Sequence, residues 1–329
     1  MGLMWARRHG GAKMIVALAA IICAAPAVAQ SYPTKPVHIV VPYAPGGITD
    51  ILARALGERL GASLGQPVVI DNRPGANSQV GAEIVARAAP DGYTLMVSAD
   101  TTFVMNRHLY AKLAYNPLTD FAPVSGLGIS PQALVVHPSV PTANVRELVA
   151  LARARPGEIN YGTFGIGSSG HLNIVLLSSL TGATFTAVHY KGAAPALTDL
   201  IGGHIQMMIV SIGLVTQAWQ TGQLKVLGFG SASRLAQFPN VPTIAETVPG
   251  FEAASWYGLA APAGTPKAIV AKLSAETQKI FNDAAFREKF LAPNVIFSIA
   301  GTPEDFAQRI KTDDAKWGKV IKEASVRVE

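Results

Sequence analysis

Residues 37–50 read VHIVVPYAPGGITD, and this stretch decides the fold class. Its apolar run, Val37–Val41, is typical of a buried strand in a parallel sheet, because both faces of such a strand are covered. Pro42 ends the run, two glycines follow, and apolar residues then recur at helical spacing from Ile48 onward. The stretch therefore predicts a strand, a tight turn and a helix in immediate succession.

The same alternation continues along the chain. Further strands are expected near residues 68–70, 93–98, 133–136, 159–163, 185–188, 205–210 and 225–228, with helical segments between most of them. Thr265-Pro266 and Thr302-Pro303 each indicate a helix start, since proline is favoured at the first helical position. Regular alternation predicts an α/β protein whose parallel-rich sheets are flanked by helices.

The N-terminus has the layout of an export signal. Basic residues precede the apolar run at residues 14–25, and the small residues of Ala27-Val28-Ala29 follow it. This three-part arrangement is typical of a secretory signal peptide, and the run is shorter than the roughly 20 residues of a spanning helix. We therefore expect residues 1–29 to be a signal peptide, cleaved after Ala29, and the mature protein to reside in the periplasm.

Composition excludes several classes of function. Of the 27 Lys and Arg residues, three lie in the expected leader, which leaves 24 against 21 Asp and Glu. So small and scattered a charge predicts no nucleic-acid partner. The only cysteine, Cys23, also lies in the leader, and the histidines show no local spacing of a metal site. Neither a metal nor a cofactor is expected.

The turn at residues 43–50 is the first candidate binding segment. Ligands of open α/β sheets bind beyond the carboxyl ends of the strands, where this turn lies. Glycine lets a ligand approach the backbone, and a helix N-terminus favours an anion. A plain tight turn explains the spacing equally well. The candidate residues in this segment are Tyr43, Ala44, Gly46, Gly47 and Asp50.

Residues 163–171, TFGIGSSGH, form a second candidate segment between a strand and a helix. Residues 165–170 fit the dinucleotide pattern G-x-G-x-x-G, but the acid expected about 20 residues later is absent. A catalytic Ser–His pair is another alternative, although the nucleophile-elbow pattern G-x-S-x-G does not occur. A second anion-binding helix start explains the segment better. Its candidate residues are Thr163, Gly167, Ser168, Ser169 and His171.

Two smaller features complete the candidate site. Ser98 and Thr101 follow a strand at the start of a short helix, where they either contact a ligand or belong to a helix cap formed by Asp100 or Thr101. Tyr190 ends a strand in the second half of the chain. It either closes over a ligand or fills the interface between domains.

A series of short motifs extends over the mature chain. They lie at residues 36–50, 71–76 (DNRPGA), 89–95 (APDGYTL), 165–172, 190–192 and 256–266. In order and spacing they resemble the solute receptors of tripartite tricarboxylate transporters, the Bug receptors. The resemblance implies a two-lobed, type II periplasmic-binding-protein fold, with residues 30–130 and 255–329 in lobe 1 and residues 131–254 in lobe 2. It also implies that the segments at 43–50 and 163–171 pinch a ligand carboxylate.

The resemblance further implies a monomeric receptor and not an enzyme. Such a receptor would capture a di- or tricarboxylate or an aromatic acid and deliver it to the membrane permease subunits of a transporter. Two alternatives stay open: an envelope hydrolase that uses Ser168 or Ser169 on an ester of a small acid, and a ligand-sensing subunit for a membrane kinase. Departures from the common family pattern, at Tyr43, Asn77-Ser78 and His189, concern the far end of the ligand.

Overall fold

The computed structural model describes residues 32–323 and 326–327. The expected signal peptide, residues 1–29, lies outside the described residues. One compact unit begins at Lys35, and every helix and strand named below belongs to it. Within the described residues, no helix combines the length and the apolar character needed to cross a membrane.

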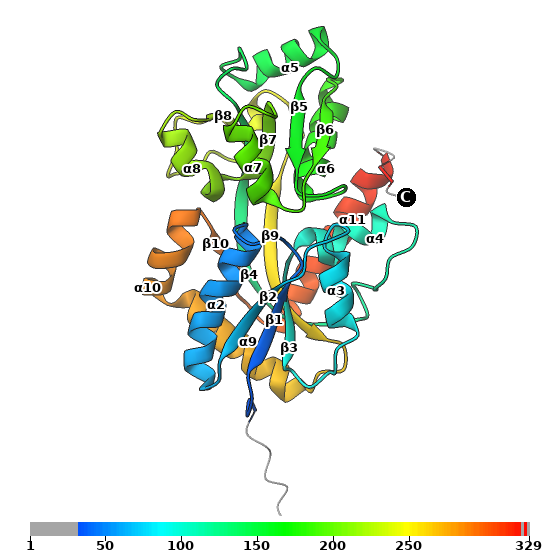
Figure 1. The fold of residues 1–329 in the computed structure, drawn as a ribbon, viewed down its shortest axis with the longest axis vertical. Helices are drawn as coiled ribbons and strands as arrows, with labels where there is room; N and C mark the ends of the chain where they lie inside the picture. Colours follow the sequence, from blue (N-terminus) through cyan, green and yellow to red (C-terminus); the bar gives the residue numbers. More distant parts are fainter. Residues whose placement is uncertain (1–31, 324–325, 328–329) are drawn as a thin grey trace, which may run out of the picture. The chain divides into compact units, whose positions relative to one another are not determined.

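The N-terminal strands and the C-terminal helices share one lobe (Figure 1). Its central strand, β1 (Val37–Val41), runs parallel to a strand on each side. Stacked and edge-on rings fill the core next to it, with ring centroids 5.9 Å apart for Phe103 and Trp256 and 5.4 Å for Phe103 and Phe306. The other elements of this lobe are β2 (Val68–Asn72), β3 (Thr94–Ala99), α2 (Ile48–Leu64), α3 (Gln79–Ala86), α9 (Lys267–Asn282) and α11 (Pro303–Glu323).

The middle of the chain forms the other lobe. Its central strand, β5 (Asn160–Thr163), is again parallel to both neighbours, β6 and β7. Buried Leu, Ile, Val and Met side chains pack around β7, all of whose residues are buried, which accounts for its apolar run. Around β5 lie β6 (Thr186–His189), β7 (Met207–Ser211), β8 (Lys225–Phe229), α5 (Val145–Ala154), α6 (Ser169–Thr181), α7 (Ala193–Ile201) and α8 (Ile212–Gln220).

Two long strands connect the lobes. β4 (Phe121–Val136) pairs antiparallel with β9 (Ala254–Pro262) along its first part and with β7 and β8 along its last part. The sheets are therefore mixed, because these antiparallel strands join the parallel ones. The fold class, a two-lobed α/β protein flanked by helices, is confirmed. The lobe limits near residues 130 and 255 stay a prediction, since β4 pairs in both halves of the sheet.

The sequence predicted only the last four residues of β4, because Pro123 interrupts the pattern. The structure continues the strand through this proline, at a point where the register with β9 shifts. A register irregularity tolerates proline because the ladder lacks a regular hydrogen bond there. Short segments complete the fold: η1 (Thr101–Met105), α4 (Asn106–Leu109), η2 (Ile244–Glu246), α10 (Ala284–Phe286), η3 (Arg287–Leu291), η4 (Ala292–Asn294) and β10 (Phe297–Ser298).

Both predicted proline-marked helix starts are found, one of them shifted by a residue. α11 begins at Pro303, where Thr302 Oγ1 accepts a hydrogen bond from the Asp305 N–H at 3.1 Å. α9 begins at Lys267, after Pro266, so Thr265 is not its cap. The Thr265 hydroxyl instead donates to the Pro262 carbonyl at 2.8 Å.

Candidate functional site

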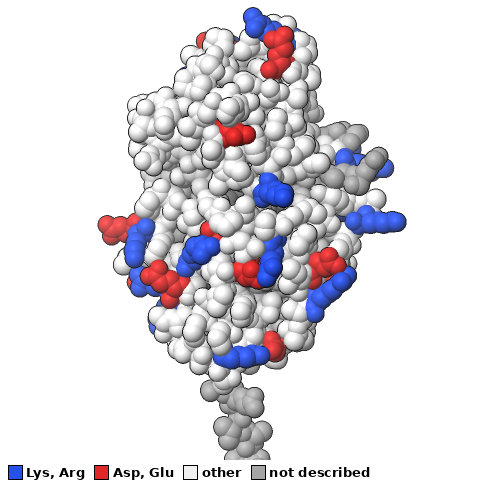
Figure 2. All heavy atoms as spheres, in the orientation of Figure 1, with Lys and Arg blue, Asp and Glu red and all other residues white. Residues whose placement is uncertain are grey.

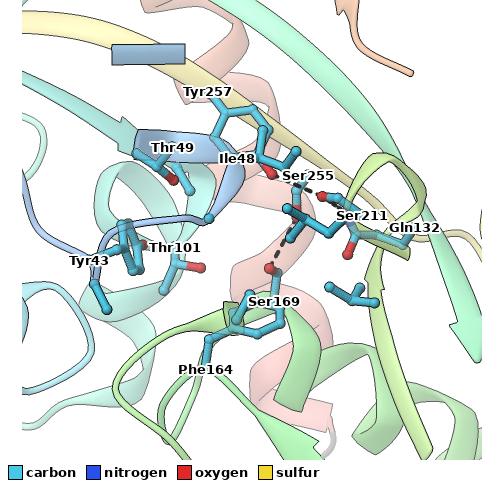
Figure 3. Close-up of a pocket in the computed structure, with 16 residues that line it drawn as sticks. Tyr43, Ile48, Thr49, Thr101, Gln132, Phe164, Ser169, Ser211, Ser255 and Tyr257 are labelled. Atoms are coloured by element: carbon cyan, nitrogen blue, oxygen red, sulfur yellow. Dashed lines mark hydrogen bonds between the residues drawn. The ribbon is translucent and has the colours of Figure 1, made fainter. Parts of the chain in front are cut away.

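A small cavity lies where the ends of β1, β3 and β7 meet the crossing strands β4 and β9 (Figure 3). Its volume is about 40 Å³, about three times the roughly 10–15 Å³ that one water needs. Five of the residues predicted from the sequence line it: Tyr43, Ala44, Gly47, Thr101 and Ser169. The other lining residues are Ile48, Thr49, Ala99, Gln132, Phe164, Ala193, Val210, Ser211, Leu214, Ser255 and Tyr257.

The two glycines of the first segment have different surroundings. Gly47 is the N-cap of α2 with ordinary extended backbone, and a Cβ added to it would meet no atom within 4 Å. Gly46 has a φ of +88°, and its N–H donates to the Asp50 carboxylate at 3.0 Å. The Gly46 N–H therefore already has a partner within the turn.

Asp50 braces this turn from within and does not line the cavity. Its carboxylate accepts hydrogen bonds from Arg54 Nε at 3.0 Å and from Asn72 Nδ2 at 2.9 Å, and Asn72 also donates to the Tyr43 carbonyl. Burial opposes ionisation of Asp50, but the hydrogen bonds from Arg54, Gly46 and Asn72 outweigh it and lower the carboxyl pKa. Asp50 therefore holds the turn in shape as a buried anion.

A buried cluster of hydroxyls supports Tyr43. The Tyr43 hydroxyl lies 3.3 Å from Thr102 Oγ1, which in turn lies 2.5 Å from Ser98 Oγ and 2.7 Å from Ser78 Oγ. The structure therefore places Ser98 behind the cavity wall, in contact with other side chains, and not in the lining. Thr101, two residues from the end of β3, reaches the cavity.

Asp100 is the N-cap residue of η1, as one of the two sequence interpretations had it. Its Oδ1 accepts a hydrogen bond from the Thr101 N–H at 2.8 Å, and the side chain is fully buried. Burial raises the pKa of the Asp100 carboxyl to about 7, against the hydrogen bonds from Thr101 and the Trp256 backbone, and the charge of Asp313 adds to the rise. Asp100 is therefore poised to change charge near neutral pH.

The serines of the second segment have separate roles. Ser168 is the N-cap of α6, and its hydroxyl accepts a hydrogen bond from the His171 N–H at 3.4 Å. Ser169, the first residue of the helix, lines the cavity and accepts a hydrogen bond from the Ser255 hydroxyl at 3.0 Å. Ser169 thereby keeps its own O–H free to donate into the cavity.

Thr163, Gly167 and His171 lie in the second lobe outside the cavity lining. His171 Nδ1 accepts a hydrogen bond from the Gly167 N–H at 2.9 Å, and its ring packs edge-on against His189, whose Nδ1 lies 2.8 Å from Thr163 Oγ1. Burial, and then the neighbouring His189, lower the pKa of His171 to about 4. These residues therefore contact one another within the segment and hold its conformation.

Tyr190 lies in an outer groove and not in the cavity. The groove is lined by residues of both lobes, among them Tyr43, Asn77, Phe164 and Lys191. The Tyr190 hydroxyl donates to Asp199 Oδ2 at 2.6 Å. Tyr190 therefore shares this groove with Tyr43 and Phe164, two residues that also line the cavity.

The sequence missed the side chains that the crossing strands contribute. Gln132 Nε2 donates to Ser211 Oγ at 3.0 Å, and Ser211 Oγ lies 3.1 Å from the Tyr257 hydroxyl. Ser211 could have been predicted as a candidate, because it lies where a strand is followed directly by a helix. The segment at residues 43–50 was selected for the same reason. Tyr257 lies within a motif shared with the Bug receptors. Gln132 gave no signal, because the strand that carries it was predicted to begin one residue later.

Among the described residues, no charged side chain lines the cavity. Charged side chains of both signs are interspersed on the outer face shown in Figure 2. Four helices instead begin at the cavity: α2 after Gly47, α6 at Ser169, α7 at Ala193 and α8 after Ser211. Their free N–H groups and partial positive charge suit an anion.

A two-lobed α/β unit with an uncharged, anion-favouring cavity at the crossing strands defines the class of solute-binding receptors. Comparisons with known proteins agree. The family model described as "Tripartite tricarboxylate transporter family receptor" matches residues 52–326. The chain belongs to this family.

Individual relatives match over nearly their full length. Protein BugT of Bordetella pertussis is 36% identical over 308 residues, which cover 93% of this chain and 94% of BugT. Rpa4515 of R. palustris, solved with adipate, is 37% identical with a TM-score of 0.86, over 89% of this chain and 98% of that one. MatC of Rhodopseudomonas palustris, solved with malate, is 32% identical with a TM-score of 0.83. The match covers 88% of this chain and 100% of MatC.

Proposed function

We propose that this chain captures a small carboxylate in its cavity and delivers it to the membrane permease subunits of a tripartite tricarboxylate transporter. The observation that carries the proposal is the convergence of four helix starts, those of α2, α6, α7 and α8, on one uncharged cavity. Adipate and malate in two solved relatives support a carboxylate ligand.

The cavity suits a carboxylate for a physical reason. A carboxylate that leaves water needs strong hydrogen bonds, and bonds to a charged acceptor are about twice as strong as neutral ones. Free N–H groups at the helix starts and the O–H of Ser169 supply such donors. Ile48, Phe164, Val210 and Leu214 add apolar walls for a short carbon skeleton.

The two sides of the cavity belong to different lobes. Gly47 and α2 belong to the lobe of β1, whereas Ser169 and α6 belong to the lobe of β5. A carboxylate held by both bridges the lobes, and its binding favours the closed form. We infer that this closure is what the permease recognises.

We place the mature protein in the periplasm. The family of receptors and the signal-peptide layout of residues 1–29 support this location. The mature chain would then begin at Gln30. Mass analysis of the envelope fraction should find that N-terminus, and a chain that begins at a lipidated Cys23 would contradict it.

A hydrolase is less well supported than a receptor. The Ser168 hydroxyl accepts a hydrogen bond from the His171 backbone, and the Ser169 hydroxyl pairs with Ser255. The His171 ring accepts from the Gly167 N–H through Nδ1. Neither serine thus has the His171 ring as its hydrogen-bond partner, which general-base activation of a nucleophile requires.

The test is a binding screen with the purified mature chain. Calorimetry and melting curves with mono-, di- and tricarboxylic acids and aromatic acids should identify a ligand that raises the melting temperature. Mass spectrometry should recover this ligand unchanged after incubation. Failure of every acid to bind would overturn the carboxylate proposal, and conversion of the ligand would favour an enzyme.

A further inference from the structure

Gln132 has a buried hydrogen-bond acceptor without a partner. Its side chain lines the cavity and is 1% exposed. Oε1 has no hydrogen-bond partner among the described residues. Figure 3 shows Gln132 and Ser211 on the side of the cavity opposite Tyr43 and Thr101. A buried acceptor is costly to leave unpaired, so its place in a ligand cavity indicates what the ligand supplies.

The orientation of the Gln132 amide follows from its neighbours. The Ser130 carbonyl lies 3.3 Å from one amide atom of Gln132, and a carbonyl can only accept a hydrogen bond. That atom must therefore be Nε2, which also donates to Ser211 Oγ at 3.0 Å. Oε1 is consequently the free atom, and flipping the amide would place two acceptors against each other.

The strand geometry explains why Gln132 belongs to the cavity. Ser130 pairs with Ser255 and Gly128 pairs with Tyr257 in the antiparallel ladder of β4 and β9. Directly opposed residues face the same side of a sheet, and every second residue of a strand returns to that side. Gln132 therefore lies on the same face as Ser255 and Tyr257, which both line the cavity.

We infer that Gln132 is a specificity-determining residue that selects a carboxylate that also carries a hydroxyl group. This inference rests on the proposed function and names the ligand class for the same cavity. A hydroxyl donates to Oε1 and also accepts from nearby hydroxyls. An ammonium group fits less well, because the lining contains no carboxylate to balance its charge.

The experiment compares matched pairs of acids by calorimetry on the purified mature chain. The pairs are succinate and malate, glutarate and 2-hydroxyglutarate, and benzoate and 4-hydroxybenzoate. In at least one pair the hydroxy acid should bind more tightly, by about three- to tenfold for a neutral hydrogen bond. In Gln132→Met, which keeps the length and removes the acceptor, the ratio of the two affinities should fall towards one.

The controls separate the possible failures. Gln223→Met makes the same replacement at an exposed position and should keep the wild-type ratio. Equal affinities within every pair in the wild-type protein would overturn the inference and leave the carboxylate proposal standing. Tighter binding of aspartate than of malate would overturn the hydroxyl assignment. Absence of binding by every acid would overturn the proposed function and this inference with it. Where Gln132→Met fails to fold, equal affinities within every pair in the wild-type protein still overturn the inference.

Discussion

The Ser255 hydroxyl donates a hydrogen bond to the Ser169 hydroxyl at 3.0 Å, and this bond joins β9 to the first residue of α6. Ser255 lies on β9, which pairs with β3 and β4, whereas Ser169 begins a helix of the lobe of β5. The bond positions the Ser169 O–H at the cavity. The crossing strands and the turns therefore both contribute side chains that can contact a ligand in the cavity.

Replacement of Gly47 by valine should weaken binding severely without unfolding the protein. Its added side chain would enter open space at the cavity, and the Gly47 backbone, with a φ of −82°, accommodates a β-branched residue. We expect affinity for the best acid of the screen to fall by at least about tenfold. Calorimetry, with a melting curve of the ligand-free variant, measures both effects.

Gly46→Val is the contrasting variant. The φ of +88° at Gly46 disfavours any side chain, so this change should lower the melting temperature of the ligand-free protein. Wild-type affinity in a cooperatively folded Gly47→Val protein would contradict the assignment of Gly47 to the ligand cavity.

Ser168→Ala and Ser169→Ala should have opposite consequences. Loss of the Ser168 cap should cost about 1 kcal/mol of unfolding free energy and leave affinity nearly intact. Loss of the Ser169 donor should weaken carboxylate binding by about 1.5–3 kcal/mol. Denaturant melts of the two ligand-free variants, beside calorimetry of binding, separate the roles. Equal losses of affinity would show that both serines contact the ligand.

Asp100 should make the protein less stable as the pH rises. Its folded pKa, about 7, lies above the ordinary value of 3.8, so the folded state holds the extra proton between these values. Stability from this group is therefore fully present below pH 4 and is lost as the pH rises through 7. His171 acts in the opposite direction between about pH 4 and 6.5, because its folded pKa is lowered. Comparison of variants is needed to separate the two.

Melting temperatures of the wild-type protein and Asp100→Asn across pH 4.5–8.5 test this. The melting temperature of Asp100→Asn should increase relative to that of the wild type as the pH rises, and this difference should level off above about pH 8. Glu252→Gln, which removes an exposed carboxylate, is the matched control and should follow the wild type. A difference between Asp100→Asn and the wild type that does not vary with pH would contradict the assignment.

The sequence predicted the turns that line the cavity but not the residues that the crossing strands contribute to it. Gly47 and Ser169 follow a local pattern, a strand that ends before a helix, and such a pattern is visible in one stretch of residues. Gln132 and Ser255 reach the cavity only because β4 and β9 pair across more than a hundred residues of sequence. Local sequence also could not separate Ser168 from Ser169, since adjacent residues at a helix start point in different directions.

The last prediction concerns closure of the lobes. A carboxylate held by Gly47 from one lobe and Ser169 from the other should draw them together, because only the closed form satisfies both sets of donors. Small-angle scattering should therefore show a smaller radius of gyration when the best acid of the screen is added at saturation. Gly47→Val should show no such decrease at the same acid concentration, since its added side chain blocks the cavity.

If β4 and β9 act as the hinge, hydrogen exchange should slow at residues 43–50 and 163–171 on ligand addition and change little within β1 and β5. Saturated binding with an unchanged radius of gyration would show that the ligand enters a preformed cavity, and that the permease must recognise something other than closure.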